Sequence, residues 1–254
     1  MKALILAAGY ATRLRPLTDT WAKELLPVGG RPIIDHIVDG IADVPEIDEV
    51  HVVTNARKAP AFEKWARGRD VTIHDDGTNS NEDRLGAIGD MQFVVERAGI
   101  DDDLLVIAGD NLFEFRLSDL VAFWSRLGAA SAVAVRDVGS LELASHYGVV
   151  DLDADGLIRS FVEKPADPQS SLAATATYVY HRNHVRLIRP YLDGEHGSDQ
   201  PGRYLGWLQR HEPVYGWVFE ESWHDIGNYE QLLEADNRLR AAAGLPPRDA
   251  YTPD

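Results

Sequence analysis

The chain has 254 residues, of which 44% are hydrophobic, and its 25 basic and 41 acidic residues leave a formal net charge of −16. This length supports one domain with a large core, and the acidic balance argues against a nucleic-acid binder or a protein of the membrane surface. The sequence has no cysteine, which excludes disulfides, thiolate metal sites and a cysteine nucleophile, and fits a cytoplasmic location. The apolar run that ends at Gly9 is too short for a signal peptide or a membrane span.

Strand-like and helix-like segments alternate along the first half of the chain. We expect strands at residues 3–8, 50–54, 71–74, 104–108 and 131–135, and helices at 32–41, 59–67, 85–98 and 117–127. Continuous apolar strands that alternate with amphipathic helices are typical of parallel sheets covered on both faces. The pattern therefore predicts an α/β fold with a doubly wound, mostly parallel mixed sheet.

The second half of the chain is richer in strands. We expect strands at residues 148–153, 157–162 and 174–180, and the turn sequence DADG predicts that the first two form a hairpin. A closing helix is expected at 228–243. The polar, proline-containing segment 244–254 is expected to be a loose tail.

The first strand leads into the segment LAAGYATRLRPLTDTWAKELLPV (Leu6–Val28), which concentrates cations in an acidic chain. Ligands bind at the carboxyl ends of strands in open α/β sheets, and Gly9 lies at such an end. Its missing side chain would let backbone N–H groups approach an anion, beside Arg13, Arg15 and Lys23. The segment contains neither a Walker loop nor the dinucleotide motif G-x-G-x-x-G. The residues alone leave two possibilities open, a phosphate site and a loop of solvated cations.

The whole segment resembles the signature of the sugar-1-phosphate nucleotidyltransferases, also called NDP-sugar pyrophosphorylases. That signature reads L-A-[AG]-G-x-[GA]-T-R-L-x-P-L-T, then K-x-L-[LV]-P-[VI], then a helix led by proline, and this chain follows it from Leu6 to Pro32. Later segments are similar to further family motifs in the same order, up to about residue 240. They are VIAGDNLF (Val106–Phe113), YGVVDLDADGLIRSFVEKP (Tyr147–Pro165) and GWVFEESWHDIGNYEQLLEA (Gly216–Ala235).

The resemblance, which is to glucose-1-phosphate thymidylyl- and uridylyltransferases in particular, implies a Rossmann-like nucleotidyltransferase fold with a small β-hairpin sugar-binding region. It implies one catalytic domain over residues 1–243, with a nucleotide-binding part at about 1–135 and a sugar-phosphate-binding part at about 136–243. The implied reaction joins an NTP, with dTTP or UTP favoured, to a sugar 1-phosphate in a single displacement that needs Mg²⁺ and releases pyrophosphate. The resemblance also allows a homo-oligomer.

Roles for individual residues follow from the resemblance. It places Arg13 on the triphosphate and Lys23 near the α-phosphate as the catalytic cations. The implied nucleotide contacts are Leu6, Ala8, Gly9, Thr12, Asn81, Gly86 and Asp110. The implied sugar-phosphate contacts are Tyr147, Gly148, Glu163 and Lys164, and the implied Mg²⁺ ligands are Asp110 and Asp225. Taken alone, an Asp at a strand end or before a helix more often caps a turn or a helix.

The match is weaker where the family reads the base. The usual segment resembles Q-x-P-x-G-L-A-[QE]-A, and the corresponding residues here are Asn79–Asp90, which keep Gly86 but lack the Gln and the Pro. Asn81, Glu82 or Arg84 could supply the missing hydrogen bonds. Thr177 occupies a place where glycine is common, and Asp199 is a candidate sugar contact.

Other functions fit parts of the sequence. A cytidylyl-, guanylyl- or adenylyltransferase could act on another sugar, a cyclitol or a non-sugar phosphate. A nucleotide-sensing subunit without activity is a second alternative, although such subunits tend to lose the catalytic cations and metal carboxylates that are all present here. A glycosyltransferase would need a D-x-D metal motif, which the letters of Asp151–Asp155 match within the predicted hairpin turn.

Overall fold

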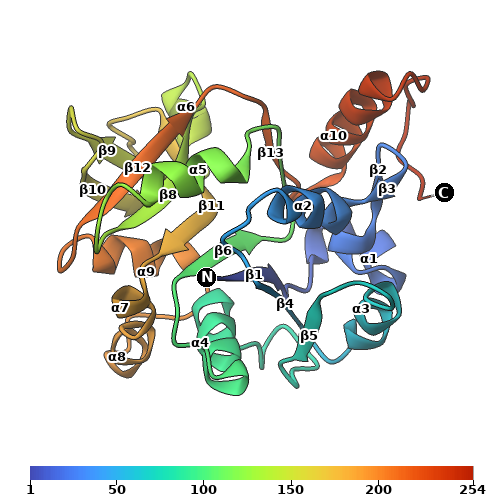
Figure 1. Cartoon of the computed structure of the whole chain (residues 1–254). Helices are drawn as coiled ribbons and strands as arrows, with labels where there is room; N and C mark the ends of the chain where they lie inside the picture. Colours follow the sequence, from blue (N-terminus) through green and yellow to red (C-terminus); the bar gives the residue numbers. More distant parts are fainter. Residues whose placement is uncertain (254) are drawn as a thin grey trace.

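A nine-stranded sheet forms the centre of the computed structural model, which describes residues 1–253. Its strands are β1 (Lys2–Ala7), β4 (Glu49–Thr54), β5 (Thr72–Asp75), β6 (Leu104–Ala108), β8 (Ser131–Asp137), β9 (Gly148–Leu152), β10 (Ile158–Glu163), β11 (Leu172–Tyr180) and β12 (Val214–Phe219). Their order is β10-β9-β11-β6-β1-β4-β5, and β8 branches off at β11 and pairs in turn with β12. Figure 1 shows β9, β10 and β12 at one end of the molecule and β4 and β5 at the other.

The neighbouring strands β6, β1, β4 and β5 run parallel, and the rest of the sheet is mixed. β1 pairs in parallel with β4 and β6, β4 with β5, and β8 with β12, whereas β11 is antiparallel to β6, β8 and β9. β9 and β10 form an antiparallel hairpin, as the DADG turn predicts. Asp153 Oδ1 closes this turn, because it accepts hydrogen bonds from the backbone N of Asp155 at 3.0 Å and of Leu157 at 2.9 Å.

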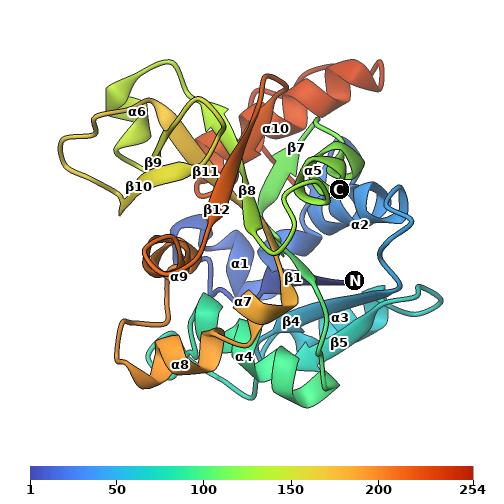
Figure 2. The same cartoon turned by 60° about the vertical axis from the view of Figure 1, so that its left-hand side comes forward.

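Helices cover both faces of the sheet, as the two views in Figures 1 and 2 show. The helices are α2 (Ile33–Ala42), α3 (Ala59–Trp65) and α5 (Leu117–Trp124) on one face and α4 (Ala87–Ala98), α8 (Ile188–Asp193) and α9 (Pro201–Leu208) on the other. The side chains of β1 alternate between the two cores, with Ala3, Ile5 and Ala7 in one and Leu4 in the other. Successive residues of a strand point to opposite faces. The predicted doubly wound, mostly parallel mixed sheet is therefore confirmed.

Several short elements have no clear signal in the sequence. They are β2 (Pro27–Val28), β3 (Arg31–Pro32), β7 (Asn111–Phe113), α6 (Leu141–Ala144), α7 (Arg182–Val185) and β13 (Trp223–Asp225). Such runs are too short to show a period. The sequence signal of strand β12 is weak for another reason, because Gly216 interrupts its run of strand-forming residues. A Cβ at Gly216 would lie 2.8 Å from Cδ2 of Leu152, so the glycine is what lets β12 pack beside β9.

The last helix, α10 (Tyr229–Ala242), covers a third and smaller core, and the segment after it packs there too. Tyr251 is buried in this core, and its hydroxyl donates a hydrogen bond to the carbonyl oxygen of Pro27 at 2.8 Å. The side chain of Asn237 exchanges two hydrogen bonds with the backbone of Arg248, at 2.7 and 2.9 Å. The tail therefore differs from the expected loose segment, because one aromatic side chain anchors it to the chain's own core.

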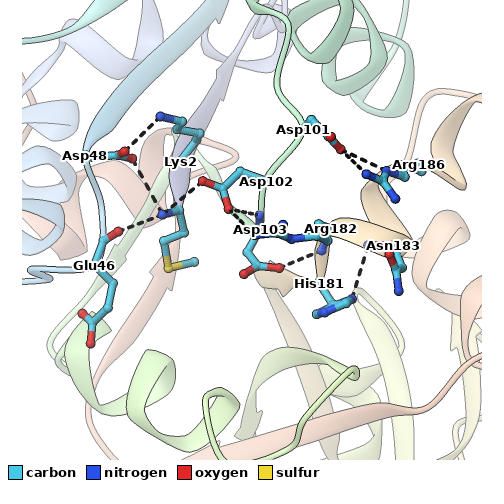
Figure 3. A network of polar contacts seen from close by, with 11 residues as sticks. Lys2, Glu46, Asp48, Asp101, Asp102, Asp103, His181, Arg182, Asn183 and Arg186 are labelled. Atoms are coloured by element: carbon cyan, nitrogen blue, oxygen red, sulfur yellow. Dashed lines mark hydrogen bonds and ion pairs between the residues drawn. The ribbon is translucent and has the colours of Figure 1, made fainter.

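An ionic network lies at the amino-terminal edge of the sheet, opposite the ends of the strands that lead into the cationic loop (Figure 3). Lys2 Nζ lies 3.0 Å from Asp48 and 2.6 Å from Glu49, and Arg182 lies 3.3 Å from Asp102. The amino-terminal nitrogen of Met1 lies 3.7 Å from Asp48 and 3.4 Å from Asp102, so the network joins β1 and β4 to α7 through the segment before β6. Within residues 1–253, no helix combines the length and the apolar character that a bilayer span requires.

Candidate active site

The opening loop holds its cations at the carboxyl edge of the sheet. After β1 the chain makes three short helical turns, η1 (Thr12–Leu14), α1 (Leu17–Thr20) and η2 (Lys23–Leu25). Gly9 is exposed, and no atom lies within 4 Å of where its Cβ would be. Asn55 fixes the start of the loop, since its Nδ2 donates to the carbonyl oxygen of Ala8 at 3.0 Å. Gly9 and Arg13 are therefore both accessible to a ligand from solvent.

Lys23 bridges two strand ends that lie far apart in the sequence. Its Nζ lies 2.5 Å from Oδ2 of Asp110 and donates to the carbonyl oxygen of Ile226 at 3.1 Å. Asp110 follows the end of β6 after Gly109, and its other carboxylate oxygen accepts a hydrogen bond from Asn111 Nδ2 at 3.0 Å. Asp225 ends β13, where it pairs with Asn111 of β7. The fold therefore brings Lys23, Asp110 and Asp225 to one place.

Neither aspartate caps a helix. The cap of α10 is Asn228, whose side-chain oxygen accepts a hydrogen bond from the backbone N of Gln231 at 2.9 Å. Asp110 lies between β6 and β7 and bonds to Lys23 and Asn111. The two carboxylates are thus free of the capping role that such residues usually have.

The charges in this centre interact strongly because water is largely excluded. Burial and the negative charge of Asp110 raise the pKa of Asp225 to about 6, against the opposing effect of the nearby cations. Burial also acts to raise the pKa of Asp110, but the charge and hydrogen bond of Lys23 outweigh it and hold that pKa below its usual value. Burial acts to lower the pKa of Lys23, and the facing carboxylates more than offset this, so the pKa is raised. The neighbouring carboxylates of Asp110 and Asp225 are of the ligand type that a hard divalent cation takes.

Glu24 is a buried acid beside this centre that the sequence reasoning did not identify. Burial raises its pKa to about 7. Its side chain packs against Gly109, where a Cβ would lie 3.0 Å from Cγ of Glu24 and 2.9 Å from the carbonyl oxygen of Leu6. The close approach of these groups explains why a glycine precedes Asp110.

One cavity of about 250 Å³ collects half of the predicted site residues. Those that line it are Arg13, Asp110, Tyr147, Gly148, Glu163, Lys164 and Asp225. Lys23 reaches this cavity through its contact with Asp110. The remaining predicted residues do not line it, and they are Leu6, Ala8, Gly9, Thr12, Asn81 and Gly86.

The hairpin supplies the wall of the cavity opposite the opening loop. Lys164 has a φ of 47°, an uncommon conformation for a residue with a side chain, and its backbone N donates to the carbonyl oxygen of Tyr147 at 3.0 Å. A Cβ at Gly148 would collide with the ring of Phe161, and one at Gly202 would collide with that ring and with the carboxylate of Glu163. Burial raises the pKa of Glu163, although the charges of Lys164 and Arg203 oppose the shift. A positive φ such as that of Lys164 is a strained conformation for a residue with a side chain, and such strain is common at functional sites.

Further residues of the cavity have only weak signals in the sequence. Trp223 Nε1 donates to Oδ1 of Asn111 at 2.5 Å, and the ring contacts Tyr147 with a centroid distance of 4.9 Å. Trp223 therefore fixes both the asparagine that holds Asp110 and the tyrosine of the hairpin.

Ala176 has a φ of 54° and lines the cavity, whereas Thr177 is fully buried. The positive φ, which suits glycine, is thus at Ala176, the neighbour of Thr177.

The D-x-D letters in the hairpin do not form a metal site. Asp153 closes the turn and pairs with Arg159 at 2.6 Å, and Asp151 and Asp155 do not line the cavity. Within residues 1–253 no cluster of three or more His, Cys, Asp or Glu side chains is arranged to hold a metal ion. The structure therefore offers no support for the glycosyltransferase alternative.

The chain is similar to known proteins over nearly its whole length. The nucleotidyl transferase family model matches residues 2–242. The UTP--glucose-1-phosphate uridylyltransferase AglF of Haloferax volcanii is 31% identical over 247 residues, which cover 94% of this chain and 97% of that protein. The bifunctional protein GlmU of Methanocaldococcus jannaschii is 28% identical over 94% of this chain, which spans only 54% of the length of that protein.

The fold of this chain is also known from solved structures. A putative glucose-1-phosphate thymidylyltransferase from Bacillus anthracis superimposes with a TM-score of 0.78, covering 94% of this chain and 95% of that one at 24% sequence identity. The family model spans nearly the whole described chain, and the AglF match spans almost the whole of that relative. The chain therefore belongs to the nucleotidyl transferase family.

Proposed function

We propose that this protein joins a sugar 1-phosphate to a pyrimidine nucleoside triphosphate, UTP or dTTP, and releases pyrophosphate. The observation that carries the proposal is that one cavity holds the Lys23–Asp110 pair, Asp225 and the hairpin residues Glu163 and Lys164. The name of the Haloferax volcanii relative, a UTP--glucose-1-phosphate uridylyltransferase, supports UTP and glucose 1-phosphate as the first substrates to test.

The reaction needs positioning and charge neutralisation rather than a protein nucleophile. A phosphate oxygen of the sugar phosphate attacks the α-phosphorus of the nucleotide, and the bond from that phosphorus to the β-phosphate breaks with its electron pair leaving on pyrophosphate. In this proposal Lys23 offsets charge at the α-phosphate, and Arg13, exposed at the cavity, offsets the charge that grows on the leaving pyrophosphate. Fixed cations in a partly desolvated site act where charge develops and need little reorganisation.

The hairpin would hold the attacking substrate. Lys164 lines the cavity on the side of Asp225 and suits the phosphate of the sugar, while Glu163 suits sugar hydroxyls. Gly148 lines the same wall, and its missing side chain lets Phe161 pack against the backbone there. The attacking oxygen would then lie between the cations of the hairpin and those of the opening loop.

Asp110 and Asp225 would hold Mg²⁺ together with phosphate oxygens and water. Burial and the charge of Asp110 raise the pKa of Asp225, and a divalent cation bound by the two carboxylates would offset both effects, because it favours the ionised form. Protein sites for Mg²⁺ commonly supply one or two carboxylates and leave the other positions to substrate phosphates and water. Bound there, Mg²⁺ would neutralise phosphate charge during the displacement. Asn111 and Lys23 would keep the Asp110 carboxylate in place.

A matrix of nucleoside triphosphates against sugar 1-phosphates, scored by pyrophosphate release, tests the proposal. We expect UTP or dTTP with glucose 1-phosphate to give the highest kcat/KM, and the Arg13→Ala variant to lose kcat more than nucleotide affinity. A purine nucleotide or a non-sugar phosphate as best substrate would favour the alternative transferases. Binding of nucleotides without pyrophosphate release for any pair would favour a sensing subunit.

A further inference from the structure

The segment proposed to read the base lies directly against a loop of the sugar cavity. Gly86 lies within this segment, Asn79–Asp90, directly before α4, and its φ of 80° suits glycine. The loop between α8 and α9 passes so close that a Cβ at Gly86 would lie 2.6 Å from the carbonyl oxygen of Ser198 and 2.8 Å from Cα of Asp199. The backbone N of Ile88 also donates to the carbonyl oxygen of Ser198 at 2.8 Å. The two segments therefore meet backbone to backbone.

A bidentate ion pair reinforces this contact. Arg84 Nε lies 2.8 Å from Oδ1 of Asp199, and Arg84 Nη2 lies 3.0 Å from Oδ2. The remaining nitrogen of the guanidinium, Nη1, donates to the carbonyl oxygen of Asn81 at 2.5 Å. All the guanidinium nitrogens of Arg84 thus have protein partners, and paired N–H groups fix the orientation of a carboxylate. Arg84 links the two segments and holds the base segment in shape.

The contact continues from Asp199 to the sugar wall of the cavity. Asp199, Gln200, Pro201 and Gly202 are consecutive, and all line the cavity. Pro201 begins α9, and Gly202 packs directly on the carboxylate of Glu163. A short, continuous stretch of backbone therefore joins the Arg84 ion pair to the residue proposed to bind sugar hydroxyls.

The loop that carries Asp199 is held in an unusual conformation. Glu195 has a φ of 56°, which is uncommon for a residue with a side chain and costs on the order of 1 kcal/mol or more. The hydroxyl of Tyr191 donates to the carbonyl oxygen of Gly197 at 2.8 Å and lies 3.1 Å from that of His196. These contacts fix the start of the loop, and the Arg84 pair fixes its end.

We propose that Arg84 and Asp199 are a positioning pair that couples the nucleotide subsite to the sugar-phosphate subsite, an inference that rests on the proposed function. A nucleotide packed against residues 79–86 restrains Arg84, and Arg84 holds Asp199 and the wall that leads to Glu163. The sugar phosphate then meets a wall already in its binding conformation and binds more tightly. Because coupling between two sites is reciprocal, the sugar phosphate tightens nucleotide binding by the same factor.

A second ion pair serves as a matched control. Arg186 Nε and Nη2 lie 3.0 and 2.7 Å from Oδ1 of Asp101, at the opposite edge of the sheet (Figure 3). It pairs the same side-chain types, and both pairs are solvent-exposed. Exposed ion pairs contribute little to global stability. Loss of either pair should therefore leave the protein folded. Only loss of the Arg84 pair should change the factor by which one substrate alters the affinity for the other.

The coupling can be measured by titration calorimetry with glucose 1-phosphate and α,β-methylene-UTP in the presence of Mg²⁺. The affinity for glucose 1-phosphate is measured without the nucleotide analogue and at saturation with it. We expect the analogue to tighten binding in the wild type about fivefold or more, which is the usual lower range of such coupling. Arg84→Gln should reduce this factor to near one, and the charge-exchanged double variant Arg84→Asp, Asp199→Arg should restore part of it. Arg186→Gln should keep the wild-type factor.

Several results would overturn the inference. If Arg84→Gln keeps the wild-type coupling factor, the pair does not connect the subsites. If it weakens binding of the nucleotide analogue alone by about tenfold and leaves the coupling factor unchanged, Arg84 reads the base instead. Independent binding of both probes to the wild type would overturn the coupling and leave the proposed function intact. Failure of the wild type to bind either probe would overturn both.

Discussion

Lys23 Nζ lies 2.5 Å from Oδ2 of Asp110, although 87 positions separate the two residues in the sequence. The contact joins the turn η2 of the opening loop to the carboxyl end of β6, next to Asp225. It makes the opening loop part of the carboxylate centre, so that one cation serves both the fold and the proposed chemistry.

Replacing Lys23 with Met should lower both stability and turnover. Removal of one partner of a buried ion pair leaves an uncompensated charge and costs about 3–5 kcal/mol of unfolding free energy. We expect kcat to fall by about a hundredfold or more, since loss of a group that stabilises developing charge typically has that effect. Urea unfolding and pyrophosphate release measure the two effects. The double variant Lys23→Met, Asp110→Asn should recover stability but not activity, and recovery of both would contradict the proposed role.

The Asp225→Asn variant should be more stable than the wild type and inactive. The substitution keeps the shape of the side chain and removes one of two neighbouring negative charges. The pKa of Asp225 is raised to about 6 in the folded protein, so its ionisation above pH 6 opposes folding. We expect the free energy of unfolding at pH 7 to rise by about 1–2 kcal/mol in the absence of ligands. A variant with wild-type turnover at limiting Mg²⁺ would exclude Asp225 as a metal ligand.

Ala176 and Ala174 should respond in opposite ways to glycine, although both line the cavity. Ala176 has a φ of 54°, so Ala176→Gly should be neutral or slightly stabilising, while Ala176→Val should destabilise the protein by about 1–3 kcal/mol. Ala174 does not have a positive φ, and Ala174→Gly should cost about 0.5–1 kcal/mol. Thermal unfolding of the three variants tests this. Equal losses for both glycine variants would show that Ala176 is not strained.

The buried pair of His51 and His74 should make the protein less stable below neutral pH. Nδ1 of His51 and Nε2 of His74 lie 3.0 Å apart between β4 and β5. Burial and the neighbouring His51 lower the pKa of His74 to about 4, and burial lowers the pKa of His51 despite the nearby carboxylate of Glu49. Below about pH 6.5 these two histidines bind protons in the unfolded chain but stay largely neutral in the folded protein.

The free energy of unfolding should therefore fall as the pH drops from 7 to 5, by about 1.4 kcal/mol per pH unit for each histidine that stays neutral. Urea unfolding at several pH values measures the slope. The His74→Leu variant should show a shallower slope over this range. An unchanged slope would assign the pH dependence to other groups, such as the half-buried His224, whose pKa is also lowered by burial.

Local patterns in the sequence determined the alternation of strands and helices, because burial on one face of an element imposes a short period on apolar residues. They also determined the hairpin at DADG and the cationic loop after β1, and the ordered motifs indicated which residues carry chemistry. The partners of those residues were decided by the tertiary structure. Lys23 meets Asp110, Trp223 fixes Asn111, and Arg84 pairs with Asp199 because strand order and register bring distant segments together. No local period records such pairings, since they depend on crossovers between elements and on close backbone contacts like that at Gly86.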